Sequence, residues 1–252
     1  MLYFTIKILE LSLIQFGLIL PFLFLKKSFL TEPLKYIRAQ FSKIILLFCT
    51  LFIQNIFLNA FRGKHIFNLD WNWIGKTLEL MIPFGFIFLF NRIPKGSNQK
   101  QITISDIGYK NVKNIKECSK ITISALILII AISHFFSSGS SKSNTFNLET
   151  FLFQLSMPGL SEEPMYRGLY PLLVAKILKK KSLISLTIPI ILFTIGHIIY
   201  FNPSQNEILY DLSPFLPITI FGCIITYVRE KTKSLYPCIL IHNLANTWHF
   251  MN

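Results

Sequence analysis

The chain has 252 residues, of which 52% are hydrophobic and 15% are charged, and its formal net charge is +13. With a mean hydropathy of +0.51, it has too little polar surface for a soluble domain of this length, so the composition predicts a polytopic membrane protein. The basic residues are spread over several loops beside apolar segments, which is typical of contact with anionic lipid and not of a nucleic-acid-binding module. We therefore expect the lipid bilayer as a partner, and no nucleic acid.

Eight apolar segments are candidate membrane spans, because a helix needs about 20 apolar residues to cross about 30 Å of hydrocarbon. In chain order they are Tyr3 to Leu25, Ile44 to Phe61, Thr77 to Phe90, Ile121 to Phe136, Phe151 to Leu178, Leu183 to Phe201, Leu212 to Val228 and Leu235 to Met251. The third and fourth are the weakest, since both are short and the third contains Glu79 and Pro83. The predicted fold class is an all-α, polytopic transmembrane helical bundle of about eight spans.

Lysine and arginine collect in the first, third, fifth and seventh loops between these segments. Because cytoplasmic loops are enriched in basic residues, this alternation places those loops in the cytoplasm and both chain ends outside. The first span is followed directly by Lys26 and Lys27 and shows no small-residue cleavage pattern. We interpret it as a retained anchor rather than a signal peptide.

Two polar stretches interrupt the apolar pattern. Within the first, the segment Gln101 to Ser105 fits a short strand or an interfacial segment, whereas Ser137 to Asn147 has the composition of a flexible linker. We use the linker to divide one integral membrane domain into N-terminal transmembrane helices, 1–136, and a catalytic transmembrane core, 137–252. All the candidate chemistry falls in the second part.

The fifth predicted span contains two adjacent carboxylates and an arginine: Glu162, Glu163 and Arg167. A charged side chain in hydrocarbon is costly, so charges in a span indicate a functional site. On a helix, Glu163 and Arg167 share one face and can form an ion pair. Glu162 is rotated from Glu163 by about 100° and lacks that partner. We therefore expect a structural role for the pair and a role as general acid or base for Glu162.

Later spans supply further polar groups. Phe193 and His197 are four residues apart in the sixth span, and His242 and Asn246 are four residues apart in the eighth. Each pair therefore shares a helix face. A single histidine on an apolar helix is usually a hydrogen-bonded core residue. Two histidines and an asparagine that follow an intramembrane glutamate pair indicate a catalytic set.

Three motifs thus follow one another on separate predicted spans: Glu162-Glu163-Pro-Met-Tyr-Arg167, Phe193-Thr-Ile-Gly-His197 and His242-Asn-Leu-Ala-Asn246. In this order they resemble the motifs of the CAAX protease and bacteriocin-processing enzyme family, also called CPBP intramembrane proteases or Abi proteins. The resemblance covers Phe151 to Asn252 and includes the approach Ser234-Leu-Tyr-Pro-Cys-Ile-Leu to the last motif. The first 150 residues resemble the family in being hydrophobic.

The resemblance implies hydrolysis of a peptide bond in or beside the membrane, without a cofactor. Glu162 and His197 would polarise a water molecule for attack on a peptide carbonyl. His242 and Asn246 would stabilise the oxyanion. A fixed hydrogen-bond donor in a dry cavity stabilises such a transition state by roughly 3 kcal/mol. Supporting roles, chiefly holding the first carboxylate in place, fall to Glu163, Arg167 and Phe193.

Three alternatives remain open. Two histidines and a carboxylate are also a ligand set of hydrolytic zinc sites, although no segment carries His-x-x-x-His or His-Glu-x-x-His. Some members of the resembled family are associated with immunity to peptides, so a non-enzymatic bacteriocin immunity protein or membrane scaffold is a second alternative. Proton transport is a third, because pumps also place glutamate and histidine in membranes, but we find no inverted repeat.

We expect the substrate to be a peptide or protein in the membrane. The abundance of Lys, Ile, Phe and Asn in the chain is typical of a low-GC bacterium. Such cells generally lack prenylated CAAX proteins, so a short secreted or signalling peptide is the preferred substrate. The predicted location is the cell membrane, as a multi-pass protein.

Overall fold

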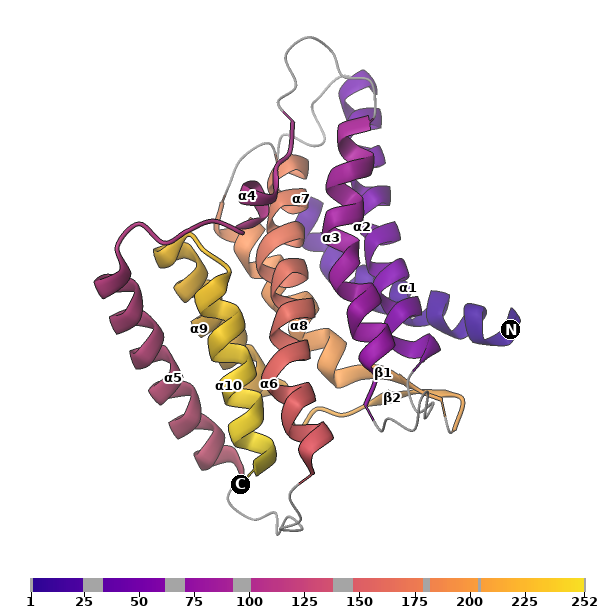
Figure 1. Cartoon of the computed structure of the whole chain (residues 1–252). Helices are drawn as coiled ribbons and strands as arrows, with labels where there is room; N and C mark the ends of the chain where they lie inside the picture. Colours follow the sequence, from indigo (N-terminus) through magenta and orange to yellow (C-terminus); the bar gives the residue numbers. More distant parts are fainter. Residues whose placement is uncertain are drawn as a thin grey trace.

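The computed structural model describes residues 2–24, 34–61, 71–92, 101–137, 147–178, 182–203 and 205–251. Most of these residues lie in helices that pack side by side, with one short hairpin (Figure 1). In chain order the elements are α1 (Leu2–Phe24), α2 (Leu34–Ala60), α3 (Trp73–Arg92), α4 (Ile104–Ile107), α5 (Ile115–Ser137), α6 (Leu148–Glu163), the π-helical segment η3 (Pro164–Leu169), α7 (Tyr170–Ile177), α8 (Leu183–Ile198), β1 (Ile199–Asn202), β2 (Glu207–Tyr210), α9 (Phe215–Thr232) and α10 (Tyr236–Met251).

Four helices in this part of the chain are long and apolar enough to cross a membrane: α1, α2 over Phe41–Ala60, α3, and α5 over Ile115–Phe136. Helix α8 is apolar but shorter. The prediction of a helical membrane bundle is confirmed, whereas the number of about eight spans is too high. Each predicted span coincides with helical structure, but the segments of the C-terminal part are short or interrupted, because prolines and a hairpin break the apolar runs.

The predicted fifth span, Phe151 to Leu178, is not one α-helix. It consists of α6, the π-helical segment η3 and α7. Pro158 and Pro164 lack an amide hydrogen and crowd the carbonyl one turn earlier, so the regular α-helical bonding is interrupted at both. Single π-helical turns inside α-helices are frequent at functional sites. The Glu162, Glu163 and Arg167 motif lies across this interruption.

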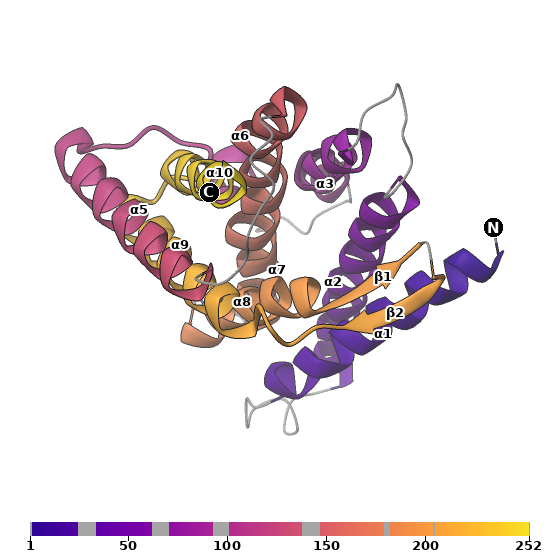
Figure 2. The ribbon, with the colours of Figure 1, turned by 90° about the horizontal axis from the view of Figure 1, so that it is seen from below.

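The sixth predicted span also ends earlier than expected. Its last residues form β1, which pairs antiparallel with β2 in the register Ile199↔Tyr210 to Asn202↔Glu207. β-Branched and aromatic residues followed by a cluster of turn-forming residues favour such a hairpin. Figure 2 shows the hairpin lying along α1. In the first polar stretch, the strand interpretation of 101–105 is wrong: Ile104 begins the short helix α4. Most of the predicted linker, 138–146, lies outside the described residues.

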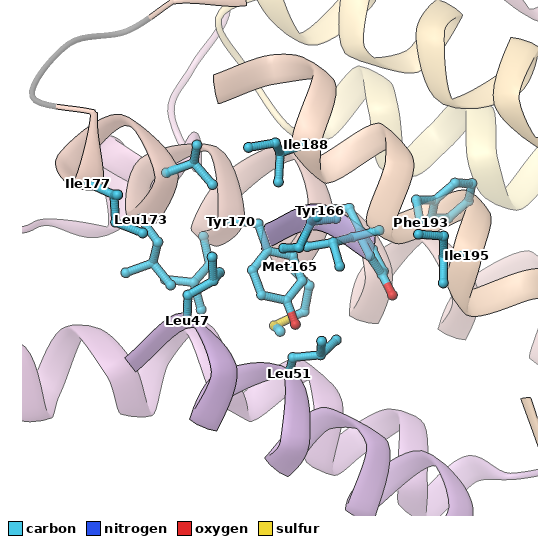
Figure 3. Close-up of a cluster of buried hydrophobic side chains, with 14 of the residues drawn as sticks. Leu47, Leu51, Met165, Tyr166, Tyr170, Leu173, Ile177, Ile188, Phe193 and Ile195 are labelled. Carbon is cyan, nitrogen blue, oxygen red and sulfur yellow. The ribbon is translucent and has the colours of Figure 1, made fainter. Parts of the chain in front are cut away.

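The largest hydrophobic core joins the two parts into which we divided the chain. Leu47 and Leu51 of α2 face the π-helical segment and α7, where Met165 and Tyr170 are fully buried (Figure 3). Side chains of α8 cover the other side of these residues. A second, smaller core holds α5 against α9 and α10. The motif-bearing segment therefore lies between N-terminal and C-terminal helices rather than within the C-terminal part.

Candidate active site

Helices α6 and α10 approach each other closely at Gly159. A Cβ atom at this position would lie 2.6 Å from Asn243 Oδ1 and 2.7 Å from the Ile239 carbonyl oxygen. The Gly159 amide donates to Asn243 Oδ1 at 2.7 Å, and Asn243 Nδ2 donates to the Ser156 carbonyl at 3.0 Å. Asn243 thus satisfies backbone groups of α6 beside Pro158, where the helix cannot complete its own hydrogen bonds. His242, the residue directly before Asn243 in α10, therefore lies beside the end of α6.

Glu163 and His242 form a buried pair. Glu163 Oε1 lies 2.6 Å from His242 Nδ1 and 3.3 Å from Arg167 Nη1. An ionised carboxylate only accepts, so Nδ1 donates and Nε2 points away from Glu163. The Arg167 guanidinium lies over the Phe193 ring, with 4.4 Å between Cζ and the ring centroid. The predicted ion pair of Glu163 and Arg167 is present, and it contacts His242.

Glu162 faces a different set of groups. Its Oε2 lies 3.8 Å from His242 Nε2, and within the described residues this oxygen accepts no hydrogen bond. Its Oε1 forms an ion pair with the Nζ of Lys76, on α3. The cation that binds Glu162 therefore comes from the N-terminal part of the chain, whereas Arg167 pairs with Glu163. That Glu163 and Arg167 help to hold Glu162 in place stays a prediction.

A polar network surrounds Lys76. Its Nζ also lies 3.0 Å from Glu79 Oε2. The Gln54 side chain of α2 donates to Glu79 Oε1 at 2.5 Å and to the Tyr166 hydroxyl at 3.2 Å, and it accepts from the Tyr170 hydroxyl at 2.5 Å. The sequence did carry a signal for this network, because Lys76 and Glu79 are charges one turn apart in an apolar segment. By composition Glu79 counts against a membrane span in this segment, whereas in the structure its carboxylate binds Lys76.

His197 lies in the last turn of α8, directly before the hairpin. Its Nδ1 is 2.8 Å from the Phe193 carbonyl oxygen. A carbonyl accepts, so Nδ1 carries the proton and Nε2 is the basic nitrogen of the neutral ring. Phe193 therefore contacts two site residues, Arg167 through its ring and His197 through its backbone.

Two cavities meet at the predicted catalytic residues. One, of about 620 Å³, extends among α1, α2, α3 and α6, and its wall includes several amide side chains together with Lys76 and Glu79. The other, of about 550 Å³, lies among α5, α8, α9 and α10 and has a mostly apolar wall. Glu162, His197 and Asn246 line both cavities, whereas His242 lines the second. The structure thus brings the four predicted catalytic residues together from α6, α8 and α10.

This arrangement places an acceptor carboxylate and a basic ring nitrogen beside a second histidine and an amide, where a polar and an apolar cavity join. Such a set is suited to acid–base chemistry on a substrate with both apolar and polar parts. Within the described residues, no group of three or more His, Cys, Asp and Glu side chains is arranged to hold a metal ion.

Comparison with known protein families finds a match in the C-terminal part of the chain. Residues 143–248 match the family described as type II CAAX prenyl endopeptidase Rce1-like. No curated protein and no solved structure matches the chain. The matched segment contains the seven site residues predicted from the sequence, whereas Gln54, Lys76 and Glu79 precede it. This C-terminal segment is therefore similar to the CAAX/CPBP family of intramembrane proteases, as the motifs predict.

Proposed function

We propose that the protein is an intramembrane endopeptidase that hydrolyses a peptide bond by means of a water molecule activated by Glu162 and His197. One observation carries this proposal: Glu162, His197 and Asn246 line both cavities at the place where the cavities meet. A peptide that occupies the junction would have a carboxylate, an imidazole and an amide within reach of a single bond. Proximity of this kind supplies a large part of enzymatic rate enhancement.

Glu162 would act as the general base. Oε1 is bound to Lys76, so the oxygen that accepts a proton from water is Oε2, which accepts no hydrogen bond within the described part of the chain. Glu162 would return this proton to the leaving amide nitrogen. His197, whose Nε2 is its basic nitrogen, would accept a second hydrogen bond from the water and fix its direction. General acid–base catalysis of this kind contributes about 10²–10⁴-fold in rate.

His242 and Asn246 would stabilise the oxyanion. For His242 to donate from Nε2 while Nδ1 donates to Glu163, its ring must carry both protons, and the Glu163 carboxylate is the counter-ion of that cation. A carboxylate that fixes the orientation and charge of a histidine is also found in serine hydrolases. Asn246 lies one helical turn after His242 and projects on the same side of α10.

We propose a membrane-associated or secreted peptide as the substrate, with a short secreted or signalling peptide preferred. The apolar cavity would hold an apolar part of the substrate, and the polar cavity would admit water and the peptide chain. The description of the matched family names a prenyl endopeptidase. Substrates with and without a prenyl group therefore have to be compared directly.

The test uses the purified full-length protein in detergent with a library of membrane peptides, some prenylated. Glu162→Gln keeps the shape of the side chain and removes the base, so we expect cleavage to fall by at least about 100-fold. Glu10→Gln is the matched control, because Glu10 is an exposed carboxylate on α1 paired with Lys7 at 2.9 Å. The Glu10→Gln variant should cleave the peptides at the wild-type rate.

Equal cleavage by the wild type and a folded Glu162→Gln variant would contradict the proposed base. Loss of wild-type activity with a chelator would instead support the zinc alternative, since we propose that no metal takes part. Absence of cleavage combined with protection of cells against a peptide, retained in Glu162→Gln, would support an immunity protein.

A further inference from the structure

We infer that Lys76 of α3 is the positioning residue of the active-site carboxylate: it holds one oxygen of Glu162 and leaves the other directed at His242. The inference rests on the proposed function for the role of Glu162 as base. The contacts on which it depends are independent of that function. Residue 76 lies outside the matched segment, 143–248, so the family match does not assign it a role.

The ion pair of Lys76 and Glu162 is shielded from solvent. The Lys76 side chain is 14% exposed and the Glu162 side chain 11% exposed. Charges in such surroundings interact more strongly than on a surface and are screened less by salt. Removing one partner leaves an uncompensated buried charge, which is strongly unfavourable. We therefore expect Glu162 to depend on Lys76 for its charge and its orientation.

Lys76 is itself held in place from two helices. Glu79, whose side chain is fully buried, lies one turn later on α3 and binds the same ammonium group. The amide of Gln54 fixes Glu79 from α2. Gln54 also contacts the hydroxyls of Tyr166 and Tyr170, which belong to the segment that follows the glutamate pair. The network joins α2 and α3 to the motif and restricts the position of the lysine.

Several titratable groups face Glu162 from the elements packed around it: Lys76 and Glu79 of α3, Glu163 of α6, Tyr166 of η3, His197 of α8 and His242 of α10. The two imidazoles can be neutral or cationic, the phenol is neutral or anionic, and the other carboxylates are neutral or anionic. Of the residues that the structure describes in contact with Glu162, Lys76 is the one that is a cation over the whole neutral range. Its removal should therefore favour the protonated form of Glu162.

The test measures protonation of Glu162 directly and does not require catalysis. Hydrophobic carbodiimides react with protonated carboxyl groups in membrane proteins, and peptide mass spectrometry identifies each modified residue. We would label the purified full-length protein from mildly acidic to mildly alkaline pH. Lys76→Met should allow labelling of Glu162 at a pH about one unit or more above that required by the wild type. Lys76→Arg, which keeps the cation, should restore the wild-type profile.

Lys7→Met is the matched control. Lys7 is also paired with a glutamate in a span, Glu10 at 2.9 Å, but on the exposed side of α1. In Lys7→Met, labelling of Glu162 should follow the same pH profile as in the wild type. Identical labelling profiles in the wild type and Lys76→Met would overturn the inference. If Lys76→Met does not fold, Lys76→Gln, which keeps a hydrogen-bond donor without the charge, takes its place in the same comparison.

Cleavage separates this inference from the proposed function. If the wild type cleaves peptides, Lys76→Met should cleave them about tenfold to 100-fold more slowly. The acidic limb of its pH–rate profile should also shift to higher pH. Unchanged rate and pH profile would overturn the inference while loss of activity in Glu162→Gln still supports the protease. If the wild type cleaves nothing, the proposed function fails, and the labelling result still decides whether Lys76 controls Glu162.

Discussion

The close approach of α6 and α10 makes Gly159 the most informative position for a structural test. Alanine adds one methyl group, which would lie 2.7 Å from the Ile239 carbonyl oxygen and 2.6 Å from Asn243 Oδ1. An ordinary van der Waals contact begins at 3.4 Å. The backbone of α10 would therefore have to retreat by about 0.7 Å, the difference between 3.4 Å and 2.7 Å. We expect Gly159→Ala to impair both stability and activity.

The magnitude follows from two opposing effects. Overpacking of a well-packed interface costs about 1–3 kcal/mol, whereas replacing glycine by alanine within a helix favours folding by about 0.5–1 kcal/mol. The net loss should be about 1–2 kcal/mol, which lowers the melting temperature by roughly 2–8 °C for a chain of this size. The same retreat would lengthen the 2.6 Å contact between Glu163 and His242. Misplacement of a catalytic group by about 1 Å can cost 100-fold in rate, so we expect a loss of about tenfold or more.

The assay compares Gly159→Ala with Gly85→Ala, in detergent, by thermal unfolding and by peptide cleavage. A Cβ at Gly85, on α3, would meet no atom within 4 Å. Gly85→Ala should be as active as the wild type and at least as stable. If Gly159→Ala matches Gly85→Ala in both measurements, the close contact between α6 and α10 does not position His242, and the reasoning is refuted.

Three further predictions concern the buried polar groups. Glu163→Gln leaves the Arg167 charge without its carboxylate and should destabilise the protein by about 3–5 kcal/mol. Adding Arg167→Met should recover part of that loss, measured by thermal unfolding. Equal melting temperatures of the single and double variants would contradict the pairing. Phe193→Leu keeps an apolar but smaller side chain and removes the ring under the guanidinium, so the free energy of unfolding should fall by about 2 kcal/mol or more. Unchanged stability would argue against this contact. Tyr170→Phe leaves Gln54 Oε1 without its 2.5 Å donor and should cost about 1–3 kcal/mol, a value that a melting curve equal to wild type would exclude.

Local sequence patterns predicted the class of the protein and the identity of its motif residues. Apolar runs located the helices, because burial in lipid requires continuous apolar surface. The spacing of four residues located Phe193 next to His197 and Glu163 next to Arg167, and both contacts are present. These features depend on helical geometry within one element, which sequence spacing specifies directly.

The helix boundaries were harder to predict. Hydropathy did not reveal that the fifth span contains a π-helical segment or that the sixth ends in a strand, since prolines and a hairpin change the backbone without changing the apolar character. The eight-span count was too high partly because of these breaks and partly because α8 and α10 have only 16 residues each. Length and hydropathy describe a segment's solvent preference and not its backbone hydrogen bonding.

Sequence patterns alone predicted a helical membrane protein whose C-terminal segment resembles CAAX/CPBP proteases, with Glu162, His197, His242 and Asn246 as candidate catalytic residues. The tertiary structure decided which groups these residues meet. It placed Lys76 on Glu162 from a helix 86 residues earlier in the chain, and it placed Asn243 on the backbone of α6. Contacts between elements depend on how helices pack in three dimensions, and neither periodicity nor spacing within one segment contains that information.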